Sequence, residues 1–194
     1  MVVSSDGMTF IGHNLPCGIY VLRIRVTTDL DLAFGRFKKG KVIHIPKGYY
    51  LYIGSAMGKN GSSSLARRLV RHATRSGDQT PHKIRSQMLE FFPTIQLGIG
   101  DLRPLRPKKL FWNIDHLLDR EKVEMDALVS LRIEDKVEGK IGQFLELRSD
   151  TKIIEKGLGA NDIAGNTHLL QLVDGVQNWP LLVDSLIQIW SDKV

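Results

Sequence analysis

Two segments of alternating residue character constrain the fold more than any other feature of the chain. "GIYVLRIRV" (18–26) and "PKGYYLYIG" (46–54) alternate in the way that is typical of strands, and together they hold all four tyrosines of the chain. Alternation places Tyr20 and Tyr52 on the strand faces opposite to their aliphatic neighbours. If the aliphatic faces of the two strands coincide, both phenol rings project from one face of one sheet.

The remaining segments predict a mixture of strands and helices. Residues 18–54 indicate an antiparallel meander, because their extended stretches are joined by turns such as "KKGK". The further elements expected are extended segments over 29–45, helices over 64–76, 81–92, 110–120, 134–147 and 179–192, and strands over 124–133, 151–154 and 168–173. We therefore expect an α/β (α+β) fold, with a small antiparallel or mixed sheet flanked by helices. At 194 residues the chain fits one domain, 1–194, with a motif core over 17–173.

The helix expected over 64–76 has three distinct faces. The serines of "GKNGSSS" (58–64) can cap its first turn. Apolar residues recur on one face and arginines on a second; these are Leu65, Leu69 and Ala73, and Arg67, Arg71 and Arg75. Arg68 and His72 are four residues apart and lie together on a third face.

The charge is distributed unevenly along the chain. Residues 36–112 contain 16 Lys and Arg against 3 Asp and Glu, a net +13, whereas residues 113–194 carry −6. A basic block of this density suggests a polyanionic partner, because cations that neutralise phosphates release counterions; the alternative is a solvated basic face. The candidate nucleic-acid-binding residues are Lys59, Arg67, Arg71, Arg75, Lys83, Arg85, Lys108 and Lys109.

The chain shows no apolar run long enough to span a membrane and no basic, then apolar, N-terminal leader, so we expect a cytoplasmic protein without a membrane partner. Its one cysteine, Cys17, excludes an intrachain disulfide and a multi-cysteine metal site. We interpret Cys17 as a small buried residue at a strand entrance.

Five short motifs occur in order along the chain. They are "GYYLYIGSA" (48–56), "LARRLVRH" (65–72), "WNIDHLL" (112–118), "GLGAND" (157–162) and "THL" (167–169), preceded by "GIY" (18–20). With "GIY" and "YIG" at its start, this series resembles the GIY-YIG nuclease superfamily. The longer motifs resemble a largely uncharacterised branch of it, sometimes fused to DNA-glycosylase domains. The resemblance covers residues 18–170 except 76–107.

The resemblance implies a metal-dependent endonuclease that hydrolyses phosphodiester bonds, most often in DNA and in a repair context. It implies a catalytic set of Tyr20, Tyr52, Arg68 and His72. It also implies one Mg²⁺ or Mn²⁺ ion held by Glu138, with Glu134 and Asp135 as substitutes. The residues that it assigns to the structural motifs are Gly18, Gly54, Ser55, Trp112, Asp115, Gly157, Gly159, Asp162 and His168.

These residue types suit the chemistry. A phenol has a pKa near ~10, so a tyrosine acts as a base only when a nearby cation favours the phenolate. The planar fork of Arg68 matches the non-bridging oxygens of a phosphate. A single carboxylate such as Glu138 can hold a hydrated Mg²⁺ ion. Tyr49 and Tyr50 are interpreted mainly as packing residues, with Tyr50 a candidate to line the site.

The chain departs from the usual pattern in four places. Tyr20 and Tyr52 are separated by 31 residues, a longer spacing than in most superfamily nucleases, although the branch tolerates it. Ile163, Ala164, Gly165 and Asn166 stand where many branch members have cysteines. Asn113 replaces a frequent histidine. Residues 76–107 form an insertion. Its cations and the two lysines that follow it, which are Lys83, Arg85, Arg103, Arg106, Lys108 and Lys109, either extend a nucleic-acid groove or belong to a docking arm that uses Phe91 and Phe92. We favour the groove on charge grounds.

Three interpretations remain open at this stage. The first is an active endonuclease, with a DNA-repair protein as a candidate partner. The second is a catalytically degenerate nucleic-acid-binding module of the same fold, and the third is a protein-interaction domain. The tyrosines can also be ordinary half-buried sheet residues.

Overall fold

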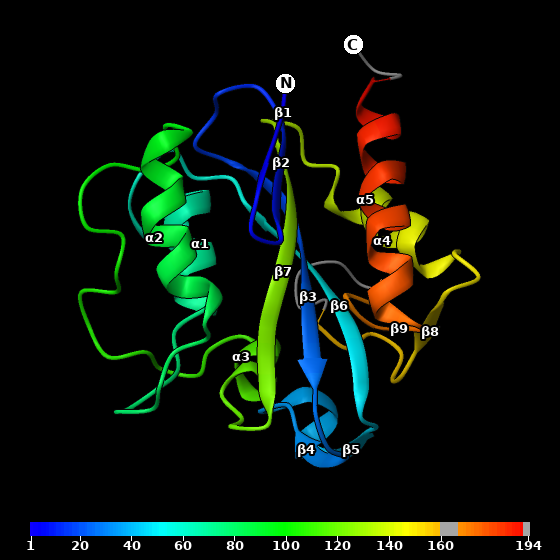
Figure 1. The fold of residues 1–194 in the computed structure, drawn as a ribbon. Coiled ribbons are helices and arrows are strands. Elements are labelled where there is room, and N and C mark those ends of the chain that lie inside the picture. The colour runs from blue at the N-terminus through cyan, green and yellow to red at the C-terminus, as the bar shows by residue number, and fades with distance from the viewer. Residues whose placement is uncertain (160–166, 192–194) are drawn as a thin grey trace.

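The computed structural model describes residues 1–159 and 167–191, and it is built around one seven-stranded sheet (Figure 1). The strands, in spatial order, are β1 (Val2–Ser5), β2 (Met8–Gly12), β7 (Val123–Arg132), β3 (Gly18–Val26), β6 (Gly48–Ala56), β9 (Leu169–Leu172) and β8 (Thr151–Ile153). All neighbouring strands are antiparallel except β2 and β7, which are parallel. The expected α/β class, with a mostly antiparallel mixed sheet and flanking helices, is confirmed.

The expected meander over residues 18–54 is wrong in its pairing. β3 pairs directly with β6, while β4 (Leu30–Ala33) and β5 (Val42–Ile45) form a separate two-stranded sheet between them in sequence. β3 has β7 on its other side, so neither edge is open to β4. The β4–β5 unit instead contributes buried side chains, including Phe34 and Ile45, to the core beneath β3 and β6.

Helices cover both faces of the sheet, which Figure 1 shows nearly edge-on. On one face lie α1 (Leu65–His72), α2 (Ile84–Thr94) and α3 (Asn113–Leu118), and on the other lie α4 (Glu138–Glu146) and α5 (Gly175–Ser191). Two short 3₁₀ turns, η1 (Phe37–Gly40) and η2 (Gly61–Ser63), precede β5 and α1. The sheet therefore separates two hydrophobic clusters.

The alternation in β3 and β6 divides their side chains between these clusters as predicted. Tyr20, Tyr50 and Tyr52 lie in the cluster under α1 to α3, whereas Ile19 and Leu51 lie in the cluster under α4 and α5. Tyr20 pairs with Gly54, and Leu22 pairs with Tyr52, in the β3–β6 register. The prediction that the rings of Tyr20 and Tyr52 project from one face of the sheet is therefore confirmed.

Several element boundaries differ from those expected. α4 begins at Glu138 and not at 134, α3 covers only 113–118, and α5 begins at Gly175. α1 ends at His72, so Arg75 lies beyond the helix. Ser64 occupies the N-cap position but its hydroxyl donates to the carbonyl of Gly61, so the expected side-chain cap is absent. β1 and β2 are not foreseen from the sequence at all.

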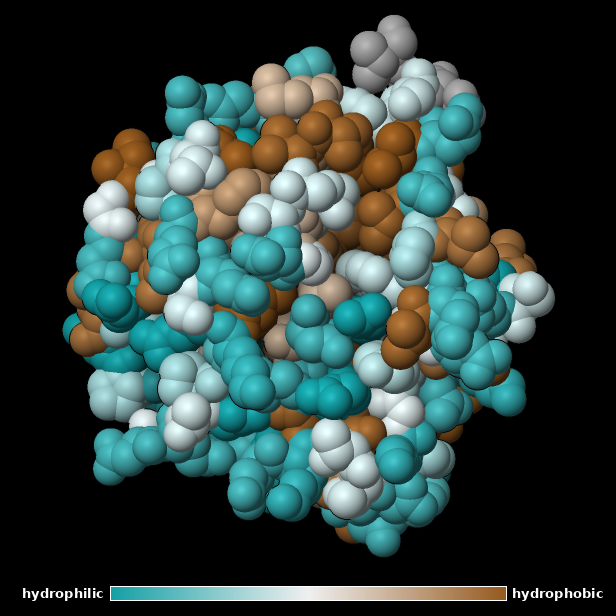
Figure 2. All heavy atoms as spheres, viewed as in Figure 1, coloured by the Kyte–Doolittle hydropathy of each residue, from teal (hydrophilic) through white to brown (hydrophobic). Residues whose placement is uncertain are grey.

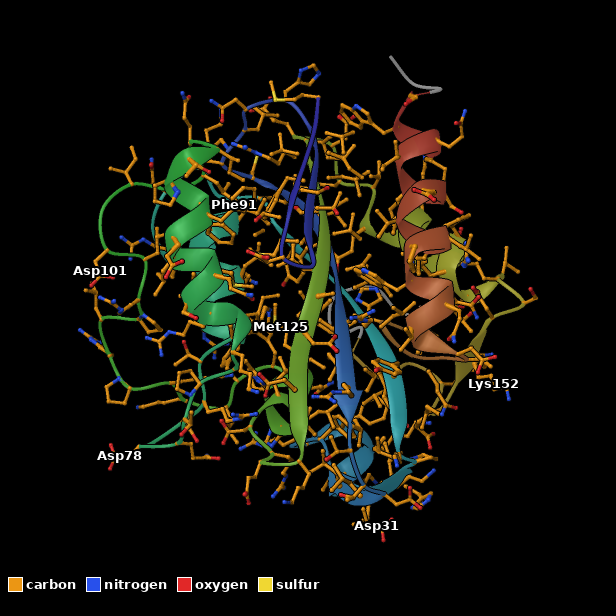
Figure 3. All side chains as sticks on the ribbon, viewed as in Figure 1. Asp31, Asp78, Phe91, Asp101, Met125 and Lys152 are labelled. Carbon is orange, nitrogen blue, oxygen red and sulfur yellow. The ribbon has the colours of Figure 1, made fainter. Side chains whose placement is uncertain are left out.

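The inserted segment 76–107 is partly a core element. Phe92 of α2 is fully buried, and both Phe91 and Phe92 contact the ring of Phe10 on β2. Figure 3 shows Phe91 between α2 and the N-terminal hairpin. The docking arm built on Phe91 and Phe92 is therefore wrong, because these rings are used within the fold.

Hydrophilic residues predominate on the lower half of the face in Figure 2, and apolar residues gather in its upper part, between the N-terminal hairpin and α5. Cys17 is buried before β3, as expected, and its thiol faces the carbonyl of Ile133 at 3.5 Å. Within the described residues, no helix has both the length and the apolar character required to cross a membrane.

Candidate functional site

A small pocket lies at the ends of β3 and β6, between α1 and α4. We call it the tyrosine pocket. Its lining residues are Tyr20, Tyr52, Gly54, Ser55, Arg68, Trp112, Glu138, Gly159 and His168. The pocket has a volume of about 50 Å³, which is room for a few water molecules or phosphate oxygens. Residues that are more than a hundred positions apart in sequence therefore meet at one pocket.

Gly54 gives the Tyr20 ring its place. The two residues are directly opposite each other in the β3–β6 pair, and a Cβ at position 54 would lie 2.5 Å from Tyr20 Oη. The ring centroids of Tyr20 and Tyr52 are 6.5 Å apart. The absence of a side chain at 54 leaves room for the Tyr20 ring next to β6.

His72 contacts the pocket residue Tyr20 but does not itself line the pocket. Its Nε2 is 2.8 Å from Tyr20 Oη, and its side chain is buried. Burial lowers the pKa of His72 well below its ordinary value, and the charge of Asp115 only partly opposes this effect. The imidazole is therefore neutral at pH 7 and its Nε2 can accept the phenol proton of Tyr20.

Burial also controls the two phenols. It raises the pKa of Tyr20, with the positive charge of Arg68 opposing and the negative charge of Glu138 adding to the effect. It raises the pKa of Tyr52 as well, and the neighbouring Tyr20 adds to that shift. Both tyrosines are therefore protonated at neutral pH unless a cation stabilises the phenolate or an acceptor takes the phenol proton.

Arg68 is the cation of the pocket. It extends from α1, four residues before His72, and its guanidinium lies 4.2 Å from the Trp112 ring centroid. Within the described residues Arg68 has no carboxylate at ion-pairing distance, and its Nε is buried without a hydrogen-bond acceptor. A guanidinium held on an aromatic face and lacking an internal counterion is suited to an anionic ligand.

Trp112 is itself held by a second arginine. Arg71 lies 4.2 Å from the same ring centroid, and each of its two terminal nitrogens donates a hydrogen bond to Asp115 at 2.9 Å. Asp115 also accepts the backbone N–H groups of Phe111 and Trp112. Burial alone would raise the pKa of Asp115, but the hydrogen bonds from Arg71 and the charge of Lys108 lower it to about 2. Asp115 therefore acts as a buried hydrogen-bond acceptor that fixes Trp112.

Glu138 provides the carboxylate of the pocket from the first turn of α4. Its Oε2 accepts a hydrogen bond from Ser55, and its Oε1 lies 3.3 Å from His168 Nδ1. Each oxygen keeps a further lone pair. Within the described part of the chain no cluster of three or more His, Cys, Asp or Glu forms a cage. The donor set therefore fits one Mg²⁺ ion held by one carboxylate, water and substrate oxygens, and does not fit a structural metal site.

The two substitutes for Glu138 lie outside the pocket. Glu134 precedes α4, is exposed and forms an ion pair with Lys59 at 3.2 Å. Asp135 is also exposed and lies before α4. The expected start of this helix at 134 is wrong: α4 begins only at Glu138, so Glu134 does not share a helical face with it.

The glycine-containing loop reaches the pocket through Gly159 and His168. Gly157 and Gly159 adopt φ of 82° and 89°, a backbone conformation that favours glycine. Asp162 and the run 163–166 lie outside the described residues.

Asn113 is buried and lines a smaller adjacent cavity with Tyr52. Tyr50 does not reach the pocket, because its hydroxyl donates to the carbonyl of Pro46 at 2.5 Å. Gly18, whose Cβ would lie 2.1 Å from the Leu131 carbonyl, allows the close approach of β7.

The basic residues predicted to bind nucleic acid divide into two groups. Arg75 and Lys108 are buried: Arg75 donates to the carbonyls of Thr80 and Val123, and Lys108 donates to Thr74. Their predicted contact with nucleic acid is wrong, because their charged ends already serve the fold. Arg71 is likewise used to bind Asp115. The candidates that keep accessible side chains are Lys59, Arg67, Lys83, Arg85 and Lys109.

One comparison places the chain in a family. The family model of DUF123, a domain of unknown function, matches residues 19–187. The chain belongs to the DUF123 family. No curated protein and no solved structure matches it. The DUF123 match contains every residue that lines the tyrosine pocket, from Tyr20 to His168, so the pocket belongs to the DUF123 portion of the chain.

Trp112 is the site residue that sequence reasoning undervalued. It is interpreted as structural from the motif, yet it lines the tyrosine pocket and contacts Arg68, Arg71 and the ring of His72. Its signal in the sequence is weak, because a tryptophan before a short helix is compatible with ordinary packing.

Proposed function

We propose that this DUF123 protein is a metal-dependent nuclease that hydrolyses phosphodiester bonds at the tyrosine pocket, with DNA as the preferred substrate. The observation that carries the proposal is the meeting of two phenols, one carboxylate and one arginine, which has no counterion among the described residues, around one small pocket. The resemblance of the ordered motifs to the GIY-YIG superfamily supports the same reaction class. The basic block supports a polyanionic substrate.

Each residue has a separate role in the proposed reaction. Arg68 binds the non-bridging oxygens of the scissile phosphate through its guanidinium. Tyr20 takes a proton from the attacking water while its own phenol proton moves to Nε2 of neutral His72, 2.8 Å away. Asp115, whose Oδ1 is 4.0 Å from His72 Nδ1, stabilises the imidazolium that results. Tyr52 lies beside this pair and excludes bulk water.

Glu138 would hold the divalent ion, with Ser55 and His168 orienting its carboxylate. Mg²⁺ or Mn²⁺, when bound, neutralises negative charge that develops on the leaving oxygen. Because the ion would depend on one carboxylate, its affinity in the absence of substrate is expected to be low.

A nuclease assay with paired variants tests the proposal. Nicked, branched and single-stranded DNA are incubated with the full chain in Mg²⁺, Mn²⁺ or EDTA. Tyr20→Phe, Arg68→Ala and Glu138→Gln should each lower the cleavage rate about a hundredfold or more. Tyr49→Phe, on the other face of β6, and Glu134→Gln, before α4, are matched controls and should cleave normally. Equal cleavage by all five variants would place the activity elsewhere.

The competing function is a DNA-binding module without catalysis. The raised pKa values of Tyr20 and Tyr52 favour it, because they oppose formation of a phenolate. Wild-type protein that binds DNA with salt-dependent affinity but cleaves no substrate in either metal would support this alternative and contradict the nuclease.

A further inference from the structure

A second concave surface lies beside the tyrosine pocket, between α1 with its preceding turn η2 and the loop 102–111. It has a volume of about 770 Å³ and we call it the basic groove. Six cations line it, of which Arg71 and Lys108 already pair with Asp115. The other four cations and two exposed apolar side chains characterise the groove: Arg67, Arg103, Arg106, Lys109, Leu105 and Phe111. In Figure 1 this loop projects away from the sheet beyond α2, and Figure 3 labels Asp101 at its outer edge.

The charge of the groove is unbalanced. No Asp or Glu is among its lining residues. Within the described ranges, Arg67, Arg106 and Lys109 have no carboxylate at ion-pairing distance, and Arg103 reaches only the exposed Asp101, at 3.4 Å. These cations therefore repel one another across a concave surface, and an anionic ligand would relieve that repulsion.

The groove also contains exposed apolar side chains, which a surface that binds phosphates alone does not need. Phe111 is 78% exposed and Leu105 is 92% exposed, and they lie among the four cations. Double-stranded nucleic acid hides the faces of its bases and offers such side chains no stacking partner. A single strand offers both phosphates and open base faces.

We infer that the basic groove binds single-stranded nucleic acid, with a base stacked on Phe111 and phosphates contacting the four cations. The groove adjoins the tyrosine pocket, because the Phe111 ring contacts the Trp112 ring edge-on at 5.6 Å and Trp112 lines that pocket. Arg67 and Arg68 are consecutive on α1 and serve the groove and the pocket respectively. The strand in the groove therefore leads to the scissile phosphate.

The inference deepens the proposed function, on which its link to cleavage rests, by naming a substrate with an unpaired arm next to the cut. Binding is measured separately, in EDTA, by fluorescence anisotropy of a labelled oligothymidine and of a duplex of equal length. Wild-type protein should bind the oligothymidine more tightly than the duplex. Phe111→Ala should weaken that binding about tenfold, whereas Phe111→Trp should retain it.

Charge is tested with two lysines. Lys109→Ala should weaken binding of the oligothymidine, and Lys152→Ala, on β8 at the opposite side of the molecule in Figure 3, should not. The circular dichroism spectrum and thermal midpoint of each variant confirm folding. Three results would overturn the inference: preference for the duplex, an unchanged affinity in Phe111→Ala, or displacement of the oligothymidine by equimolar polyglutamate, which would indicate an acidic protein as the partner. Wild-type protein that binds the oligothymidine but cleaves no substrate would contradict the nuclease and still support the basic groove as a binding site.

Discussion

At the scale of single residues, Gly54 and Tyr20 show how closely the pocket is built. A Cβ at position 54 would meet Tyr20 Oη at 2.5 Å and Cζ at 2.6 Å, distances that no packed side chain tolerates. We predict that Gly54→Ala lowers the free energy of unfolding by about 1–3 kcal/mol, because the Tyr20 ring or the backbone of β6 must move. Urea denaturation monitored by circular dichroism measures the change.

The same prediction has an internal control. In a Tyr20→Ala background the clash is gone, so Gly54→Ala should cost much less there than in the wild type. Equal costs in both backgrounds would show that the contact between the two residues is not what requires a glycine.

His72 makes a second prediction at this scale, on the dependence of stability on pH. Its pKa in the folded protein is below the ordinary value of 6.5, so the unfolded chain binds the proton more readily. The stability that depends on neutral His72 is therefore complete above about pH 6.5 and is lost as pH falls toward the folded pKa. Buried His82 contributes in the same direction. The difference in unfolding free energy between wild type and His72→Gln should shrink between pH 7.5 and 5, and a constant difference would contradict the shift.

At the scale of elements, the end of α1 separates a structural arginine from an accessible one. Arg75 lies just past the helix, is 8% exposed and reaches Glu124 at 3.2 Å as well as two backbone carbonyls. Arg75→Met should lower the free energy of unfolding by about 3 kcal/mol, because Glu124 loses a buried partner. Arg67→Ala, eight residues earlier and within α1, should leave the free energy of unfolding within about 0.5 kcal/mol of wild type and weaken binding of nucleic acid. The reverse pattern would restore Arg75 to the binding surface.

The element scale also shows what the sequence could and could not reveal. Alternation in β3 and β6 assigns Tyr20 and Tyr52 to one face correctly, because burial imposes a period of two on a strand. The partners of Arg75 and Lys108 include three backbone carbonyls, which leave no mark in residue type. The parallel pairing of β2 with β7 joins segments more than a hundred residues apart and has no local pattern. α4 begins at Glu138, whose carboxylate accepts a hydrogen bond from Ser55, and no helical period indicates that contact.

At the scale of the molecule, the tyrosine pocket gathers side chains from β3, β6, α1, α4 and the segment before α3. Its members could be proposed from motif order, but their convergence depends on β3 pairing with β6 and on α1 and α4 lying at the same end of the sheet. Trp112 contacts both Arg68 and Arg71, and Arg71 on α1 is bonded to Asp115 on α3; no spacing in the sequence specifies these contacts.

The last prediction concerns the salt dependence of binding by the whole molecule. The sequence gives residues 36–112 a net charge of +13, but the structure uses several of those cations internally: Arg71, Arg75 and Lys108 as described, and Lys38 and Lys41 in ion pairs with Glu155. If only the four cations of the basic groove contact phosphates, the logarithm of the oligothymidine affinity should fall with the logarithm of salt concentration with a slope of about −3, at about −0.7 per contact. Each of Arg106→Ala and Lys109→Ala should make the slope shallower by about 0.7, because each removes one contact. A slope near −9 would instead mean that the whole basic block contacts the strand, and that ion pairs such as those with Glu155 and Asp115 open when nucleic acid binds.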